Sequence, residues 1–165
     1  MSYDRGPIFA GHGVWIGPGR PLQSAAVTHL SHSVADTEAI AEELASKLSG
    51  GECIALYGQL GAGKTQFVRG LVRGLGGDPQ SVCSPTFVLL NVYDSGRLAV
   101  YHLDAYRVRG EDDLESIGFC ELLEQGGVVA VEWSDRVAGI LPASAITVRI
   151  DVQTQRRRGI EIDRT

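Results

Sequence analysis

Apolar residues recur with helical spacing in three parts of the chain. Between residues 40 and 48, isoleucine and leucine repeat every four positions, which predicts an amphipathic helix with Asp36 as its N-cap. A second helix is expected over about residues 65–75, directly after a glycine-rich turn. A third is expected within residues 111–123, because the acidic residues that open this segment favour a helix N-terminus.

Short apolar runs between these segments predict strands. Residues 53–57 and 128–131 are unbroken apolar runs, the second closed by Glu132, as is typical of central strands buried on both faces. Residues 87–93 and 98–104 are rich in β-forming residues and are separated by Asp-Ser-Gly-Arg, which predicts a hairpin. Residues 146–152 and 159–163 alternate between apolar and polar, as half-exposed strands do. The order of elements predicts an α/β fold, a three-layer sandwich around a mixed central β-sheet.

The start of the chain shows neither the apolar spacing of a helix nor the alternation of a strand. Residues 1–27 are dense in glycine and proline, which interrupt helices and strands, so we expect a flexible N-terminal extension there. Residues 28–165 would then form a single domain, in keeping with a chain of 165 residues. Trp15 lies between two apolar residues and could dock on the domain or on a neighbour.

Charge and cysteine content narrow the classes of function. Fifteen Lys and Arg stand against twenty Asp and Glu, a net charge of −5, which disfavours independent binding to nucleic acid. No apolar run is long enough to cross a membrane, and the first residues do not resemble a secretory signal, so we expect a cytoplasmic protein. Cys53, Cys83 and Cys120 lack the spacing of a zinc site, and we expect them to be reduced and mostly buried.

Residues 58–65 carry the strongest chemical signal. They read GQLGAGKT and match the phosphate-loop pattern G-x-x-x-x-G-K-S/T, with a predicted strand before them and a predicted helix after them. Glycines allow consecutive backbone N–H groups to surround phosphate oxygens, and the helix dipole reinforces them. Lys64 is expected to reach the β- and γ-phosphates, and the Thr65 hydroxyl to hold Mg²⁺. The predicted nucleotide-binding residues of this segment are Gly58, Gly61, Ala62, Gly63, Lys64, Thr65 and Gln66.

Carboxylates and hydroxyls at other element ends could complete such a site. Asp104 and Glu132 each close a predicted strand, and a phosphate loop needs a carboxylate to organise the Mg²⁺ shell. Ser84 and Thr86 lie where related loops place a mobile segment that senses the γ-phosphate. Solvated strand ends and a plain proline turn would give the same pattern, so these alternatives stay open.

Three classes of phosphate-loop protein can be distinguished by the motifs that each requires besides the loop. A GTPase is excluded because the chain has no N/T-K-x-D motif for guanine, which favours ATP. A small-molecule kinase is the main alternative, since it shares the loop and would need an arginine-lined acceptor pocket. A binding module whose partner affinity depends on the nucleotide state is the third possibility.

Four motifs in order resemble the TsaE (YjeE) family over about residues 31–163. They are the loop 58–65, SPTF at 84–87, HLDAYR at 102–107 and VEW at 131–133. This resemblance implies an ATPase that works with TsaD and TsaB to form threonylcarbamoyladenosine beside the anticodon of tRNAs. It further implies that tRNA is met only indirectly, through the complex.

The resemblance also assigns roles to individual residues. Asp104 corresponds to an aspartate needed for hydrolysis, Glu132 to a glutamate that contributes to Mg²⁺ binding, and Ser84 with Thr86 to a switch. The catalytic residues implied are Asp104, Glu132 and Lys64, and the metal ligands Thr65, Glu132 and Asp104.

Three further positions are implied to lie near the nucleotide. Thr37 corresponds to a threonine against the base, and Trp133 to a tryptophan that matters for activity. Residues 155–158, which read QRRR, lie where the family places an arginine or glycine close to the nucleotide, and Arg156 is the residue assigned to that position. From the residues alone, Trp133 could equally be core packing and Arg156 part of a solvated basic turn.

Overall fold

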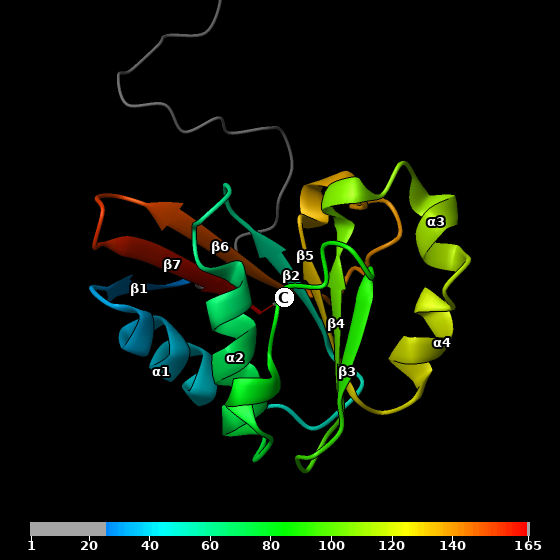
Figure 1. Cartoon of the computed structure of the whole chain (residues 1–165), viewed down its shortest axis with the longest axis horizontal. Helices are drawn as coiled ribbons and strands as arrows, with labels where there is room; N and C mark the ends of the chain where they lie inside the picture. Colours follow the sequence, from blue (N-terminus) through cyan, green and yellow to red (C-terminus); the bar gives the residue numbers. More distant parts are fainter. Residues whose placement is uncertain (1–25, 165) are drawn as a thin grey trace, which may run out of the picture.

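A seven-stranded mixed sheet forms the centre of the molecule, and the computed structural model describes residues 26–164 (Figure 1). The strands are β1 (Val27–Ser31), β2 (Cys53–Tyr57), β3 (Leu90–Tyr93), β4 (Val100–Asp104), β5 (Val128–Glu132), β6 (Ile146–Val152) and β7 (Arg158–Asp163). The helices are α1 (Val34–Ala45), α2 (Lys64–Gly74), α3 (Glu111–Glu115) and α4 (Phe119–Glu124). Short 3₁₀ turns cover Pro79–Ser81, Ala105–Arg107 and Ser134–Arg136.

The strand order is β1-β7-β6-β2-β5-β4-β3. Strands β4, β5, β2 and β6 run parallel, whereas β3, β7 and β1 pair antiparallel with their neighbours. The predicted mixed sheet is therefore confirmed, and so is the hairpin of β3 and β4. Because β2, β5 and β4 are parallel, their carboxyl ends meet at one edge of the sheet.

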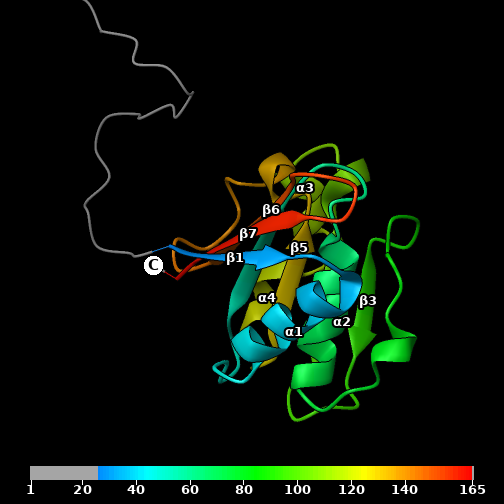
Figure 2. The same cartoon turned by 90° about the vertical axis from the view of Figure 1, so that its left-hand side faces the viewer.

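Helices cover both faces of the sheet, which gives the predicted three layers (Figures 1 and 2). Strand β2 shows the division, because its residues alternate between two separate cores. Ile54 and Leu56 pack in the core beneath α1 and α2, whereas Cys53 and Ala55 pack in the core with α3 and α4. A central strand buried on both faces has no polar position to spare, which explains its unbroken apolar run.

Helix α1 begins three residues earlier than the sequence predicted. Ser33, not Asp36, is the N-cap: its hydroxyl accepts a hydrogen bond from the Asp36 backbone N–H at 3.0 Å. The Asp36 carboxylate in turn accepts from the His32 N–H at 2.8 Å. The Ser33 hydroxyl thus satisfies a backbone N–H that the first helical turn leaves unpaired, and the Asp36 carboxylate satisfies one just before the helix. Asp36 therefore does mark the start of the helix, but it lies in the first turn and Ser33 occupies the cap position.

Two predicted elements are shorter or more divided than expected. The helix after residue 111 is split into α3 and α4 at Gly118, whose φ of 74° is left-handed and ends a helix. Strand β3 begins only at Leu90, because the preceding Leu89 also has a positive φ, 70°. Residues 87–89 therefore form a turn rather than the first part of the strand.

Strand β1 was not predicted. It begins at Val27, the last residue that the sequence assigned to the extension, and pairs antiparallel with β7. Its two large apolar residues, Val27 and Leu30, are three positions apart and so do not follow the two-residue alternation of a strand. Both side chains are about half exposed. Periodicity alone could not find a strand at this edge of the sheet. The rest of the extension, including Trp15, lies outside the described residues.

The cysteines differ from the sequence-based expectation. Cys53 is buried in β2, but Cys83 and Cys120 are exposed, so the expectation that all three are mostly buried is wrong. Burial raises the pKa of the Cys53 thiol from its ordinary value near 9 to about 12. Within residues 26–164, none of the helices has both the length and the apolar character needed to cross a membrane.

The thiols should therefore differ sharply in reactivity. At about pH 8, iodoacetamide is expected to modify Cys83 and Cys120 readily and to leave Cys53 unmodified, because alkylation needs the thiolate. Mass spectrometry of tryptic peptides measures this, and denatured protein, in which all three should react, is the control. Modification of Cys53 in the native protein as fast as that of Cys83 would contradict its burial.

Candidate functional site

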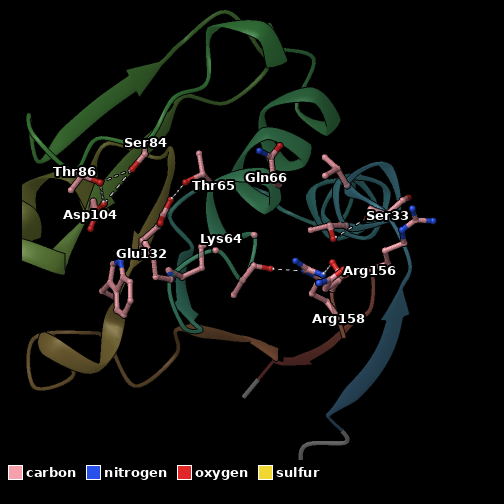
Figure 3. A pocket seen from close by; sticks show the side chains of 18 of the residues that line it. Ser33, Lys64, Thr65, Gln66, Ser84, Thr86, Asp104, Glu132, Arg156 and Arg158 are labelled. Atoms are coloured by element: carbon pink, nitrogen blue, oxygen red, sulfur yellow. Dashed lines mark hydrogen bonds between the residues drawn. The ribbon is translucent and has the colours of Figure 1, made fainter. Parts of the chain in front are cut away.

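A cavity of about 790 Å³ opens at the carboxyl ends of β2, β5 and β4. Figure 3 shows its side chains, which come from segments far apart in the sequence. It is the largest of the cavities described and the one that holds the predicted phosphate loop. Its lining includes the predicted residues Thr37, Gly61, Ala62, Gly63, Lys64, Thr65, Gln66, Ser84, Thr86, Asp104, Glu132, Trp133 and Arg156.

The phosphate loop joins β2 directly to α2, as predicted. Gly63 is the N-cap of α2 with a φ of 111°, a conformation that side chains rarely adopt. Gly58 has a φ of 155°, and a Cβ there would lie 2.7 Å from the Ile150 carbonyl oxygen. Gly58 is thus required for a close approach between the loop and β6. It is the one predicted binding residue that does not line the cavity.

Lys64 is buried at the start of α2, with its side chain held by the loop. Its ammonium donates hydrogen bonds to the carbonyl oxygens of Gly58 at 2.6 Å and Gln59 at 3.1 Å. Burial lowers the pKa of Lys64, and the charges of Glu132, Asp104 and Asp135 oppose that shift. A cation among nearby carboxylates and backbone carbonyls is placed to meet an anion that enters the cavity.

Trp133 connects Lys64 to the end of β5. Its φ of 59° turns the chain sharply after Glu132. The Lys64 ammonium lies 3.8 Å from the centroid of the Trp133 ring, a cation–π contact. The Tyr106 ring packs against the Trp133 ring, with 5.0 Å between the two centroids. Trp133 is therefore a wall of the cavity and not simple core packing.

The two strand-end carboxylates lie side by side. Asp104 and Glu132 are register partners across β4 and β5, and both are buried. Glu132 Oε1 accepts a hydrogen bond from the Thr65 hydroxyl at 2.7 Å. Asp104 Oδ1 accepts from the Tyr106 backbone N–H at 2.8 Å. The structure thus brings together the three residues predicted as metal ligands.

This group has the chemistry that Mg²⁺ prefers. Its donors are all oxygens, one hydroxyl and two carboxylates, and Mg²⁺ is usually held by one or two carboxylates together with substrate phosphates and water. Among residues 26–164, no group of three or more His, Cys, Asp or Glu side chains is placed to hold a metal ion. The residues present therefore fit Mg²⁺ bound together with a polyphosphate.

The predicted switch residues contact the second carboxylate. Thr86 donates a hydrogen bond to Asp104 Oδ2 at 2.5 Å, and the Ser84 hydroxyl lies 3.4 Å from the same oxygen. The side chains that follow, Phe87 and Val88, are 83% and 65% exposed. This segment is therefore attached to the site through its hydroxyls while its apolar side chains face solvent.

The opposite side of the cavity is polar and basic. Thr37 is buried there, and its hydroxyl pairs with that of Ser31 at 2.8 Å. Arg156 lines the cavity as the resemblance implied. Arg158, from the same basic segment, also lines it, and its Nε donates to the Ala62 carbonyl of the phosphate loop at 3.3 Å. The lining residues missed by sequence reasoning are His32, Ser33, Val34 and Leu60.

His102 is a functional candidate that the sequence did not reveal as such. It is fully buried in β4, and its Nε2 lies 2.8 Å from Glu132 Oε1. The available signal was a polar residue two positions before Asp104 on the same side of a strand. That signal is too weak alone, because many strands carry such a residue.

Comparisons with known proteins agree with this geometry. The family model "Threonylcarbamoyl adenosine biosynthesis protein TsaE" matches residues 31–160. A tRNA threonylcarbamoyladenosine biosynthesis protein TsaE from Treponema pallidum is 40% identical over 81% of this chain and 97% of its own length. Proteins of the same name from Aquifex aeolicus and Bacillus subtilis are 40% and 39% identical over 78% and 70% of this chain, and 90% and 71% of theirs.

A solved structure supports the fold as well. The crystal structure of YdiB from Bacillus subtilis superposes with a TM-score of 0.72 and 28% sequence identity. The match covers 87% of this chain and 88% of that one.

The contact between Lys64 and Trp133 makes ligand binding observable. We expect ATP with Mg²⁺ to change the fluorescence of Trp133 saturably, because phosphates would draw the ammonium away from the ring. A Trp15→Phe variant leaves Trp133 as the single tryptophan of the chain. Adenosine, which has no phosphate, is the control and should leave the emission unchanged. Saturable ATP binding by calorimetry without any change in emission would contradict this interpretation.

Proposed function

Because the chain belongs to the TsaE family of threonylcarbamoyl adenosine biosynthesis proteins, we propose that it is a Mg²⁺-dependent ATPase in the formation of tRNA threonylcarbamoyladenosine. The observation that carries the proposal is the hydrogen bond of 2.7 Å between the Thr65 hydroxyl and Glu132. It joins the phosphate loop to one of the two carboxylates at the side of the cavity where Mg²⁺ is proposed to bind, which we call the metal side. We expect the protein to work in the cytoplasm.

Each group then has a defined part in ATP hydrolysis. The backbone N–H groups of residues 61–65 and the Lys64 ammonium bind the phosphates. Thr65 and Glu132 would hold Mg²⁺, which would supply neutralisation of phosphate charge. Asp104 orients the attacking water and accepts its proton. Its neighbour Thr86, bonded to the same carboxyl group, reports whether the γ-phosphate is present.

The distribution of positive charge supports slow turnover by the isolated chain. The arginines that line the cavity are Arg156 and Arg158, and Figure 3 shows them across the loop from Asp104 and Glu132. An arginine that stabilises the transferred phosphoryl group accelerates related enzymes by about 10³ to 10⁵. We propose that TsaD and TsaB complete the site, and that tRNA is met through them, consistent with a net charge of −5.

The small-molecule kinase alternative is not favoured. The matched relatives carry the name of a tRNA modification protein and cover most of this chain. A kinase would transfer phosphate to an added acceptor and would have no need of protein partners. Rapid partner-independent turnover, or turnover only when a small acceptor is supplied, would revive it.

Lys64→Ala is the first test of the proposed activity. We expect ATP hydrolysis by the wild-type chain to be slow alone and faster with its cognate TsaD and TsaB. Loss of the phosphate-binding ammonium should reduce both rates by at least about 100-fold, the usual effect of removing one such group. Lys47→Ala is the matched control, because Lys47 forms an exposed ion pair with Glu43 away from the cavity. Retained turnover in Lys64→Ala would overturn the assignment.

Asp104→Asn separates binding from hydrolysis. The amide keeps an oxygen to accept the Tyr106 N–H, so the fold of this turn should persist. We expect ATP affinity to stay within about threefold of the wild type while kcat falls by about 100-fold, as when a general base is lost. Affinity is measured by calorimetry and kcat by phosphate release. An unchanged kcat would transfer the role to Glu132 alone.

A further inference from the structure

A continuous row of hydrogen-bonding groups leads from the metal side of the cavity into the protein. Glu132 Oε1 lies 2.8 Å from His102 Nε2. The other ring nitrogen, Nδ1, lies 3.4 Å from the Tyr93 hydroxyl. That hydroxyl donates to the Cys83 carbonyl at 3.1 Å and accepts from the Cys83 N–H at 3.3 Å. The row thus ends on the backbone residue that immediately precedes Ser84.

Burial makes the geometry of this row restrictive. His102 is fully buried, and Tyr93 and Glu132 are 8% and 4% exposed. A buried polar group that loses its partner costs about 1–3 kcal/mol, since no water replaces the bond. Each member therefore holds its neighbour in one arrangement. Glu132 Oε1 is fixed from two sides, by Thr65 and by His102, and neither of these uses Oε2.

The hydrogen atoms can be assigned along the row. A carboxylate accepts only, so His102 Nε2 carries a hydrogen and donates it to Glu132. A ring with this single N–H has Nδ1 as an acceptor. Tyr93 has a single hydroxyl hydrogen and two acceptors for it, the Cys83 carbonyl and His102 Nδ1. The closer acceptor is Cys83. Movement of Cys83 away from Tyr93 would release this hydrogen to His102.

We propose that His102 and Tyr93 are positioning residues that couple the Glu132 carboxylate to the start of the switch segment, residues 84–86. This inference rests on the proposed function, in which Glu132 holds Mg²⁺. His102 orients Glu132 through its Nε2, and Tyr93 anchors the backbone of Cys83 together with Asn91, whose amide donates to the Cys83 carbonyl at 3.2 Å. Outer partners of this kind typically change metal affinity 10- to 100-fold when they are removed.

The coupling reaches the second carboxylate as well. The segment that starts at Cys83 bonds Asp104 through the hydroxyls of Ser84 and Thr86. One segment is therefore linked to Asp104 directly and to Glu132 through two buried side chains. A displacement of that segment, such as loss of the γ-phosphate would cause, acts on both carboxylates together.

The anchor at Cys83 can be tested without any hydrolysis. In a Cys120→Ser background, Cys83 is the one exposed thiol among residues 26–164, and its alkylation rate reports on the segment. Tyr93→Phe removes only the hydroxyl and should raise this rate several-fold. Tyr101→Phe is the matched control, because Tyr101 lies in the same hairpin and its hydroxyl bonds Gln125 rather than Cys83. An equal rate in Tyr93→Phe and Tyr101→Phe would overturn the anchoring role.

The orientation of Glu132 is tested by Mg²⁺ titration of the binding of a non-hydrolysable ATP analogue. His102→Leu should raise the Mg²⁺ concentration for half-maximal binding by at least about tenfold and leave the affinity without Mg²⁺ unchanged. A general loss of folding would change both. His102→Gln, whose amide can still donate to Glu132, should restore most of the Mg²⁺ affinity. Equal behaviour of the two variants would contradict the orienting hydrogen bond.

A double-mutant cycle tests whether the two residues act as one chain. Tyr93→Phe alone should raise the half-saturating Mg²⁺ concentration about threefold, and the double variant with His102→Leu should be no worse than His102→Leu alone. Multiplied effects would overturn the coupling. Because these readouts need no turnover, a wild type that fails to hydrolyse ATP would refute the proposed function while the Cys83 and Mg²⁺ results still decide this inference.

Discussion

The site depends on the parallel register of β2, β5 and β4. Leu56 of β2 pairs with Glu132, and Glu132 pairs with Asp104, so the three strands end at one level. The phosphate loop leaves β2 at this level and the two carboxylates close β5 and β4. A shift of one residue in either pairing would send a carboxylate to the opposite face of the sheet. The hydrophobic packing of the central strands on both faces prevents such a shift. It thereby fixes the positions of Glu132 and Asp104 relative to the phosphate loop.

Opposite charges in the cavity are balanced by its surroundings. Lys64 loses hydration on burial, which favours its neutral form, while Glu132 and Asp104 favour the cation. The Trp133 ring and the carbonyl oxygens of the loop give the ammonium partners within the protein. A polyphosphate would replace these partners with stronger ones. The side chain therefore stands ready for an anion without being fixed to one carboxylate.

Much of this site was predictable because its residues obey local rules. The loop of residues 58–65 lies between a recognisable strand and helix, and Asp104 and Glu132 end apolar runs that periodicity detects. The contribution of His102 depends on which strands become neighbours, and no local pattern contains that information. The edge strand β1 was missed for a related reason: it gains its order from pairing with β7. The division of the last helical segment at Gly118 shows that one glycine can override an apolar repeat.

Helices α1 and α2 approach each other unusually closely at Gly70 and Gly74. A Cβ on Gly70 would collide with the Glu38 carbonyl, and one on Gly74 would lie 2.7 Å from the Ala45 Cβ. Arg73 between them bonds both Glu38 and Glu42. The helix that carries the phosphate loop is thereby locked against rotation about its own axis. We therefore expect α1 and α2 to move as one body when a nucleotide binds. Any rearrangement that the nucleotide causes should then involve the other elements that line the cavity.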